Sequence, residues 1–201
     1  SMNAPLEIAP ATGRLGILTP GMGAVASTFI AGVIAARNGL TAPIGSVSQM
    51  AHIRLGSRGE DRNPLIREFV PLAELDDIVF GGWDPISANV LEAANTCGVL
   101  EEKDLAPISA ELEGIIAMDA VFNNRWVKKL NGTRVKSITA MWDQAQALID
   151  DIERFAILAL GHGDDAVSRL EFFTADGRAT GDEFDEFGVP VVPLQTGADA
   201  G

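Results

Sequence analysis

A glycine pattern at residues 21–26 is the first feature of this sequence that could do chemistry. Gly-Met-Gly follows a short apolar run that ends at Pro20, and no charged residue occurs again until Arg37. The pattern is G-x-G-x-x-A, in which the first glycine permits a tight turn and the second lets the backbone approach a pyrophosphate. The N–H groups of the following helix would face that anion. The pattern predicts a dinucleotide site, and a ligand-free connection is the alternative.

The acidic residue that usually accompanies such a turn is missing from its expected place. An Asp or Glu about 20 positions further on normally accepts a hydrogen bond from the adenosine ribose. Here residues 45–56 read GSVSQMAHIRLG, and the first acid after the turn is Glu60. Either Ser46 and Gln49 hold the ribose, or an acid reaches it from another strand end.

Asp84 is the obvious substitute for the missing acid. It follows the apolar segment VFGGW, and the Gly81-Gly82 pair is expected to leave room for a ligand to approach. The alternative is that Asp84 caps a helix beginning at Pro85, a place that favours Asp in any protein. The two roles are compatible, so both remain open.

Apolar periodicity places these residues on a recurring order of strands and helices. The patterns predict strands at 14–19, 43–49 and 76–84, a further possible strand at 156–160, and helices at 23–38, 86–100, 109–130 and 138–155. Strands that alternate with helices favour an α/β fold with an open, mainly parallel sheet covered by helices. Ligands of such sheets bind at the carboxyl ends of the strands, where residues 21–23 and 81–84 would lie.

Three arginines in residues 54–62 are a weaker candidate for a phosphate site. Arg54, Arg58 and Arg62 could clamp a phosphate, but an ordinary solvated loop neutralised by Glu60 and Asp61 is the simpler interpretation.

The sequence predicts no metal site. Cys97 is the single cysteine, and His52 and His162 have neither zinc-ligand spacing nor a nucleophile motif beside them. The acidic segment 176–187 has Phe187 where a calcium loop needs a bidentate Glu. The cysteine content is typical of a reducing, cytoplasmic setting.

Charge and hydropathy argue against two classes of partner. The 201 residues carry 15 basic and 28 acidic side chains, a formal charge of -13, which argues against nucleic acid. Residues 1–13 are interpreted as an N-terminal extension with a tag scar at Ser1, and they show no signal-peptide pattern. No apolar stretch is long enough to span a membrane.

Four segments together resemble inositol-3-phosphate synthase of the bacterial type. They read PGMGAVASTFIAGV, PIGSVSQMAHIRLGSR, NPLIREFVPLAELDDIVFGGWD and AVFNNRWVKKLNGTRVK, and they occur in the family's order. The resemblance covers residues 14–155 and implies a Rossmann-type, doubly wound domain that binds NAD. The cofactor contacts that it implies fall on Gly21, Met22, Gly23, Ala24, Val25 and Asp84.

The family's activity is implied by the same resemblance. It is the NAD-dependent conversion of D-glucose 6-phosphate to 1L-myo-inositol 1-phosphate, by oxidation, intramolecular aldol cyclisation and reduction. A homo-oligomer, a tetramer in the family, is also implied. Bound cofactor must be retained between the two redox steps, so a deep and closed site is expected.

Residues 156–201 depart from the family's pattern. This acidic, Gly-rich tail contains no lysine, and it stands where the family continues toward its second, catalytic domain. The tail is interpreted as a truncated or reduced catalytic region, and no catalytic residue is assigned. The alternative function is a non-catalytic NAD-binding or assembly module derived from the family.

Overall fold

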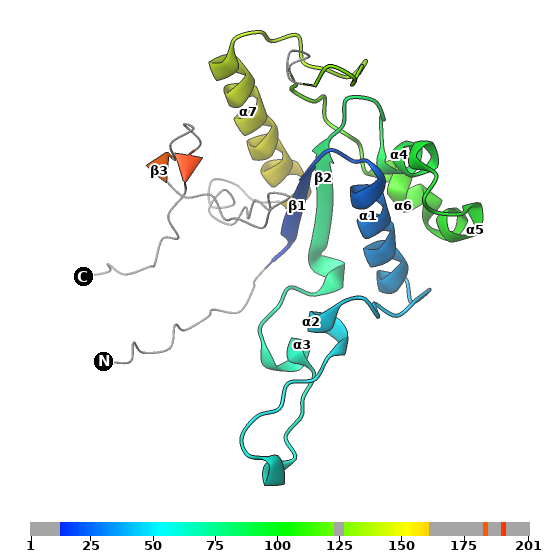
Figure 1. The fold of residues 1–201 in the computed structure, drawn as a ribbon, viewed down its shortest axis with the longest axis vertical. Helices are drawn as coiled ribbons and strands as arrows, with labels where there is room; N and C mark the ends of the chain where they lie inside the picture. Colours follow the sequence, from blue (N-terminus) through cyan, green and yellow to red (C-terminus); the bar gives the residue numbers. More distant parts are fainter. Residues whose placement is uncertain (1–12, 123–126, 161–182, 185–189, 192–201) are drawn as a thin grey trace.

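Two parallel strands form the centre of the molecule (Figure 1). The computed structural model describes residues 13–122, 127–160, 183–184 and 190–191. Strand β1 (Leu15–Pro20) pairs with strand β2 (Ile78–Trp83) from Leu15 opposite Ile78 to Pro20 opposite Trp83. The strands predicted at 14–19 and 76–84 are therefore confirmed, and their carboxyl ends meet at one edge of the sheet.

Helix α1 (Ala24–Arg37) follows β1 directly and packs against the sheet. Its buried residues are spaced like one face of a helix: Ser27, Ile30, Ala31 and Ile34. Phe29 also meets Phe80 of β2 edge to face, with ring centroids 5.6 Å apart. The helix ends at Asn38 and Gly39, which adopts a φ of +68°. The predicted helix 23–38 is confirmed.

Short helices complete the layer on the α1 side. They are α4 (Val90–Cys97), α5 (Glu102–Leu105), α6 (Ser109–Gly114) and the 3-10 turn Ala106–Ile108. The core between this layer and the sheet is formed chiefly by Met22, Ile30, Ile34, Phe80, Val90 and Leu112. Asn89 caps α4 by accepting from the Glu92 amide at 2.9 Å, so this helix starts later than the predicted residue 86.

Helix α7 (Met141–Leu160) lies on the opposite side of the sheet from α1 (Figure 1). Helices on both faces of a parallel sheet define the doubly wound α/β class that the sequence predicts. The predicted helix 138–155 is confirmed. It continues through residue 160, so the strand predicted at 156–160 is wrong.

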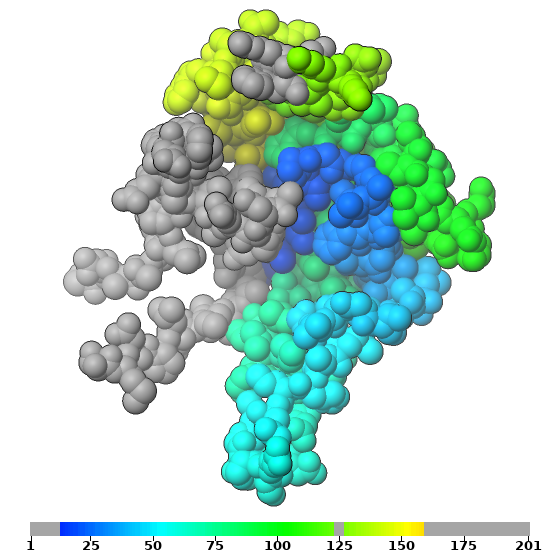
Figure 2. Space-filling view, in the orientation of Figure 1, coloured from blue at the N-terminus to red at the C-terminus, as the bar shows by residue number. Residues whose placement is uncertain are grey.

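The strand predicted at 43–49 is also wrong. Its residues form a turn followed by helix α2 (Val47–Met50), because Pro43 lacks an N–H donor and Gly45 weakens an extended segment. Beyond α2 the chain forms a narrow hairpin with isolated bridges His52–Leu65 and Leu55–Arg62. Figure 2 shows this hairpin as a lobe that projects from the body. Helix α3 (Ile66–Phe69) and 3-10 turns Arg58–Glu60 and Leu75–Asp77 complete the region.

The helix predicted at 109–130 is confirmed only as far as Gly114. Beyond it the chain is extended, and Met118 makes a parallel bridge to Trp83 at the end of β2. The Met118 amide donates to the Gly82 carbonyl at 2.9 Å, and its carbonyl accepts from the Asp84 amide at 3.0 Å. The β-branched pair Ile115-Ile116 after Gly114 favours this extended path.

Residues 156–201 are described only in part. The tail contributes the end of α7 and a short antiparallel pair, β3 (Glu183–Phe184) with β4 (Pro190–Val191). His162 and most of the rejected calcium-like segment lie outside the described residues.

The described residues contain neither a candidate membrane span nor a candidate metal centre. None of the helices found there combines the length and apolarity needed to cross a bilayer. The same residues contain no group of three or more His, Cys, Asp or Glu side chains arranged to hold a metal ion.

Candidate cofactor-binding site

The glycine turn at residues 21–23 connects β1 to α1 at the carboxyl edge of the sheet. Gly21 has a φ of +109°, a conformation that side chains rarely adopt, so the backbone itself requires glycine there. Its amide donates to the Trp83 carbonyl at 2.9 Å. The first residue of the turn is therefore tied to the end of β2.

Met22 is tied to the residue after β2. Its amide donates to Asp84 Oδ2 at 3.1 Å, across 62 positions of sequence. The Met22 side chain has no exposed surface, and Asp84 is only 7% exposed. Two consecutive amides of the turn thus have fixed acceptors on the neighbouring strand end.

Asp84 also orders the chain that follows it. Its Oδ1 accepts from the Ile86 amide at 2.8 Å and from the Ser87 amide at 2.7 Å. Asp84 therefore accepts from backbone amides as a cap would, but it does so in a turn. It does not cap a helix, because α4 begins only at Val90. A carboxylate can accept about four hydrogen bonds, so Oδ2 keeps acceptor capacity beyond its contact with Met22.

The amino end of α1 is open to a ligand. Gly23 is the N-cap residue, it has no side-chain capping bond, and the first turn contains no acidic residue. A Cβ added at Gly23 would have no atom within 4 Å, and the Val25 side chain is 86% exposed. First-turn amides have no intrahelical acceptor, and the helix dipole favours an anion beside them. The geometry suits a phosphate.

Gly81 and Gly82 do not leave room for a ligand, contrary to the expectation from the sequence. A Cβ on Gly82 would lie 2.3 Å from the Thr19 carbonyl oxygen, and one on Gly81 would lie 2.6 Å from Phe155 Cε2. Both glycines are needed because β1 and α7 pack closely against β2. Their role is in packing, and ligand access to Asp84 does not depend on them.

The alternative polar groups lie far from the turn. Ser46 and Gln49 belong to the α2 region, beyond the C-terminal end of α1, and the arginine-bearing hairpin projects further in the same direction (Figure 1). Arg54, Arg58 and Arg62 are exposed there. The structure therefore brings Asp84 to the glycine turn and does not bring these groups to it.

Glu60 has a local role in that hairpin. The Ser57 amide and hydroxyl donate to Glu60 Oε1 at 3.2 and 2.9 Å, and these bonds lower the pKa of Glu60 below its usual value. This carboxylate orders the loop.

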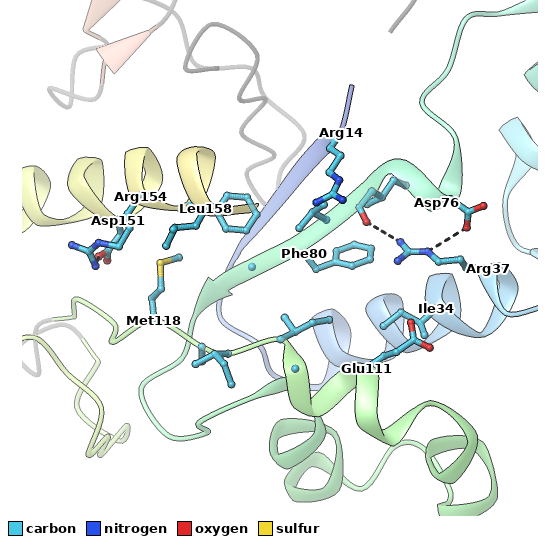
Figure 3. Close-up of a pocket in the computed structure, with 18 residues that line it drawn as sticks. Arg14, Ile34, Arg37, Asp76, Phe80, Glu111, Met118, Asp151, Arg154 and Leu158 are labelled. Carbon is cyan, nitrogen blue, oxygen red and sulfur yellow. Dashed lines mark hydrogen bonds and ion pairs between the residues drawn. The ribbon is translucent and has the colours of Figure 1, made fainter. Parts of the chain in front are cut away.

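A separate cavity of about 780 Å³ runs along the free side of β2 (Figure 3). Arg37 and Asp76 lie at one end of it, and Asp151 and Arg154 of α7 lie at the other. Residues 78–81 of β2 also line it. No residue of the glycine turn lines this cavity, which is distinct from the candidate cofactor site.

The fold and this turn together define a Rossmann-type dinucleotide-binding domain. Residues 15–157 match the family model described as myo-inositol-1-phosphate synthase, an NAD-binding domain, and the chain belongs to that family. The family resemblance and the fold class inferred from the sequence are confirmed.

Individual relatives agree with this assignment. Inositol-3-phosphate synthase 1 of Bacteroides thetaiotaomicron is 49% identical over 150 residues, which cover 74% of this chain and 34% of the relative. Inositol-3-phosphate synthase of Spirodela polyrhiza is 31% identical, with 71% and 31% covered. The chain spans about a third of the length of these relatives.

A solved structure supports the fold. The inositol-3-phosphate synthase of Caenorhabditis elegans superimposes with a TM-score of 0.59 at 20% identity, covering 72% of this chain and 32% of that one. At this identity the similarity concerns the fold alone.

Sequence reasoning missed the part of Trp83 in the site. Its carbonyl, a backbone group, holds Gly21, and no side-chain pattern could reveal this contact. The available signal was the position of Trp83 directly before Asp84 at a strand end.

Proposed function

We propose that this chain supplies the NAD site of an inositol-3-phosphate synthase. The proposed cofactor contacts are Gly21, Met22, Gly23, Ala24, Val25 and Asp84. The observation that carries the proposal is the doubly tied glycine turn, at Trp83 and Asp84, in front of an uncapped helix. A pyrophosphate accepts hydrogen bonds from the first-turn amides of such a helix, which have no intrahelical acceptor, and family membership favours NAD among dinucleotides.

Each residue contributes to binding in a different way. Gly21 provides the turn, and Gly23 provides the open approach for the pyrophosphate. The remaining acceptor capacity of Asp84 Oδ2 suits a ribose hydroxyl. When bound, NAD supplies a hydride acceptor and later a hydride donor, which matches a redox-neutral conversion of glucose 6-phosphate to an inositol phosphate.

Binding is tested by thermal unfolding of the purified chain with NAD⁺. A ligand at about 100 times its Kd stabilises the folded state by about 2.7 kcal/mol, so the melting temperature should rise with NAD⁺ concentration. ATP serves as a control for a generic nucleotide effect. An unchanged melting temperature at millimolar NAD⁺ argues against the site.

The catalytic assignment is tested with glucose 6-phosphate and NAD⁺. Formation of an inositol phosphate by this chain supports the enzyme. NAD⁺ binding without product supports the second candidate, a non-catalytic NAD-binding module. A homo-oligomer and a cytoplasmic location are further parts of the proposal, and light scattering at the assay concentration tests the first.

A further inference from the structure

A buried carboxylate lies on the α7 side of the sheet, in contact with the last residue of β2. Asp151 of α7 is 1% exposed, and its Oδ2 accepts from the Trp83 indole nitrogen at 2.8 Å and from Lys136 Nζ at 2.9 Å. Arg154 Nη1 lies 3.4 Å from the other carboxylate oxygen. Donors of this kind offset the hydration that a buried carboxylate loses.

Trp83 is held through both its side chain and its backbone. Its side chain is fixed to α7 through Asp151, while its carbonyl accepts from the Gly21 amide at 2.9 Å. The next residue, Asp84, accepts from the Met22 amide. Any movement of Trp83 would therefore shift the acceptors of two consecutive amides in the glycine turn.

Lys136 connects Asp151 to the end of β2 through a second set of contacts. Its amide donates to the Ala120 carbonyl at 2.9 Å, and the nearby Arg134 amide donates to the Pro85 carbonyl at 3.0 Å. Gly132 packs so closely that an added Cβ would lie 2.4 Å from the same Pro85 oxygen. The segment joined to Asp151 through Lys136 thus also braces the residue directly after Asp84.

We propose that Asp151 is a positioning residue for the NAD-binding turn. It acts through Trp83 and Lys136, and it fixes the strand end on which the Gly21 and Met22 amides depend. The proposal rests on the proposed function, because the turn is the expected pyrophosphate site. It goes further by assigning a binding role to a helix on the opposite face of the sheet.

The test compares NAD⁺ affinity in five variants of the full chain by calorimetric titration. Asp151→Ala removes the carboxylate, Trp83→Phe removes only the indole donor, and a double variant combines them. Asp150→Ala is the matched control, because Asp150 is exposed on the same helix and bonds only Gln146 among the contacts described. Each titration is made at a temperature where circular dichroism shows a folded chain.

The proposal predicts a shared loss of affinity. Asp151→Ala and Trp83→Phe should each weaken NAD⁺ binding about tenfold. Because both changes break the same contact, the double variant should have about the same Kd as the weaker-binding single variant. Asp151→Asn keeps an acceptor for the indole and should restore part of the affinity. Unchanged Kd in folded Asp151→Ala overturns the proposal. If that variant does not fold, unchanged Kd in Trp83→Phe does so.

A ligand-free measurement separates this proposal from the proposed function. Backbone amide resonances of Gly21 and Met22 should shift in Asp151→Ala or Trp83→Phe and stay in place in Asp150→Ala. Unmoved resonances overturn the positioning role. If the variants show the amide shifts but the wild-type chain binds no NAD⁺, the proposed function is refuted and the positioning of the turn by Asp151 remains supported.

Discussion

The two glycines of the turn are required for different physical reasons. Gly21 has a φ of +109°, where a side chain is strained whatever space surrounds it. Gly23 has ordinary extended dihedral angles of -65° and -160°, and nothing lies near its missing Cβ. The fold therefore needs Gly21, whereas no contact within the fold requires glycine at position 23, where the proposed pyrophosphate would approach.

Replacing Asp84 by Asn should change both the stability of the chain and its affinity for NAD⁺. Asp84→Asn replaces a carboxylate that accepts three amide hydrogen bonds with a side chain that has one acceptor oxygen. At least one buried amide loses its partner, which costs about 1–3 kcal/mol. We expect a lower melting temperature and weaker NAD⁺ binding together. Loss of stability with unchanged affinity would restrict Asp84 to a structural role.

Single residues also show where sequence reasoning reaches its limit. Asp84 was identified because an acid at a strand end is chemically conspicuous, and the fold does bring it to the turn. Its bond with the Met22 amide depends on the pairing of β1 with β2, which no local pattern encodes, whereas its bonds with the Ile86 and Ser87 amides are local. Asp151 was missed, although a charged residue on the packed stripe beside Leu148 and Phe155 signals a buried partner.

Elements were predictable where local patterns agree with tertiary packing. β1, α1, β2 and α7 contain apolar runs or stripes that the packing of the sheet and its helices buries, so the pattern and the packing select the same structure. The region 43–49 has Pro43 and Gly45 instead, and neither suits a central strand. The predicted helix 109–130 failed after Gly114 because hydrogen bonding of residue 118 to the end of β2 overrides helical periodicity.

The contact between α7 and β2 gives a prediction at the element scale. Gly81→Ala places a Cβ about where Phe155 and Leu18 already pack, and overpacking of this kind costs about 1–3 kcal/mol. We expect a lower urea midpoint with little change in slope.

A second variant identifies the cause. Gly81→Ala with Phe155→Leu should recover part of the lost stability, because the smaller side chain vacates the ring position. Gly114→Ala is the control, because the added Cβ has open space around it and Gly114 does not have a positive φ. Gly98 is not used, because its φ is +61°. Equal destabilisation by the Gly81 and Gly114 variants would contradict the packing account.

At the scale of the whole molecule, the proposed cofactor site combines three separate parts of the chain. The turn after β1, the strand end of β2 and the inner face of α7 meet through a short series of hydrogen bonds. The sequence predicted the class of this arrangement, because family motifs and alternating elements both indicate it. It did not predict that the large cavity lies elsewhere, along the free side of β2.

An equilibrium titration with NAD⁺ measures directly whether the glycine turn binds the cofactor. Wild type is compared with Gly23→Val, which blocks the pyrophosphate approach, and with Gly32→Val, the same change within α1 at a position that also has open space. We predict saturable binding to wild type and Gly32→Val, and at least about tenfold weaker binding to folded Gly23→Val. Equal affinity of folded Gly23→Val and wild type, or no binding by wild type at millimolar NAD⁺, would contradict the account.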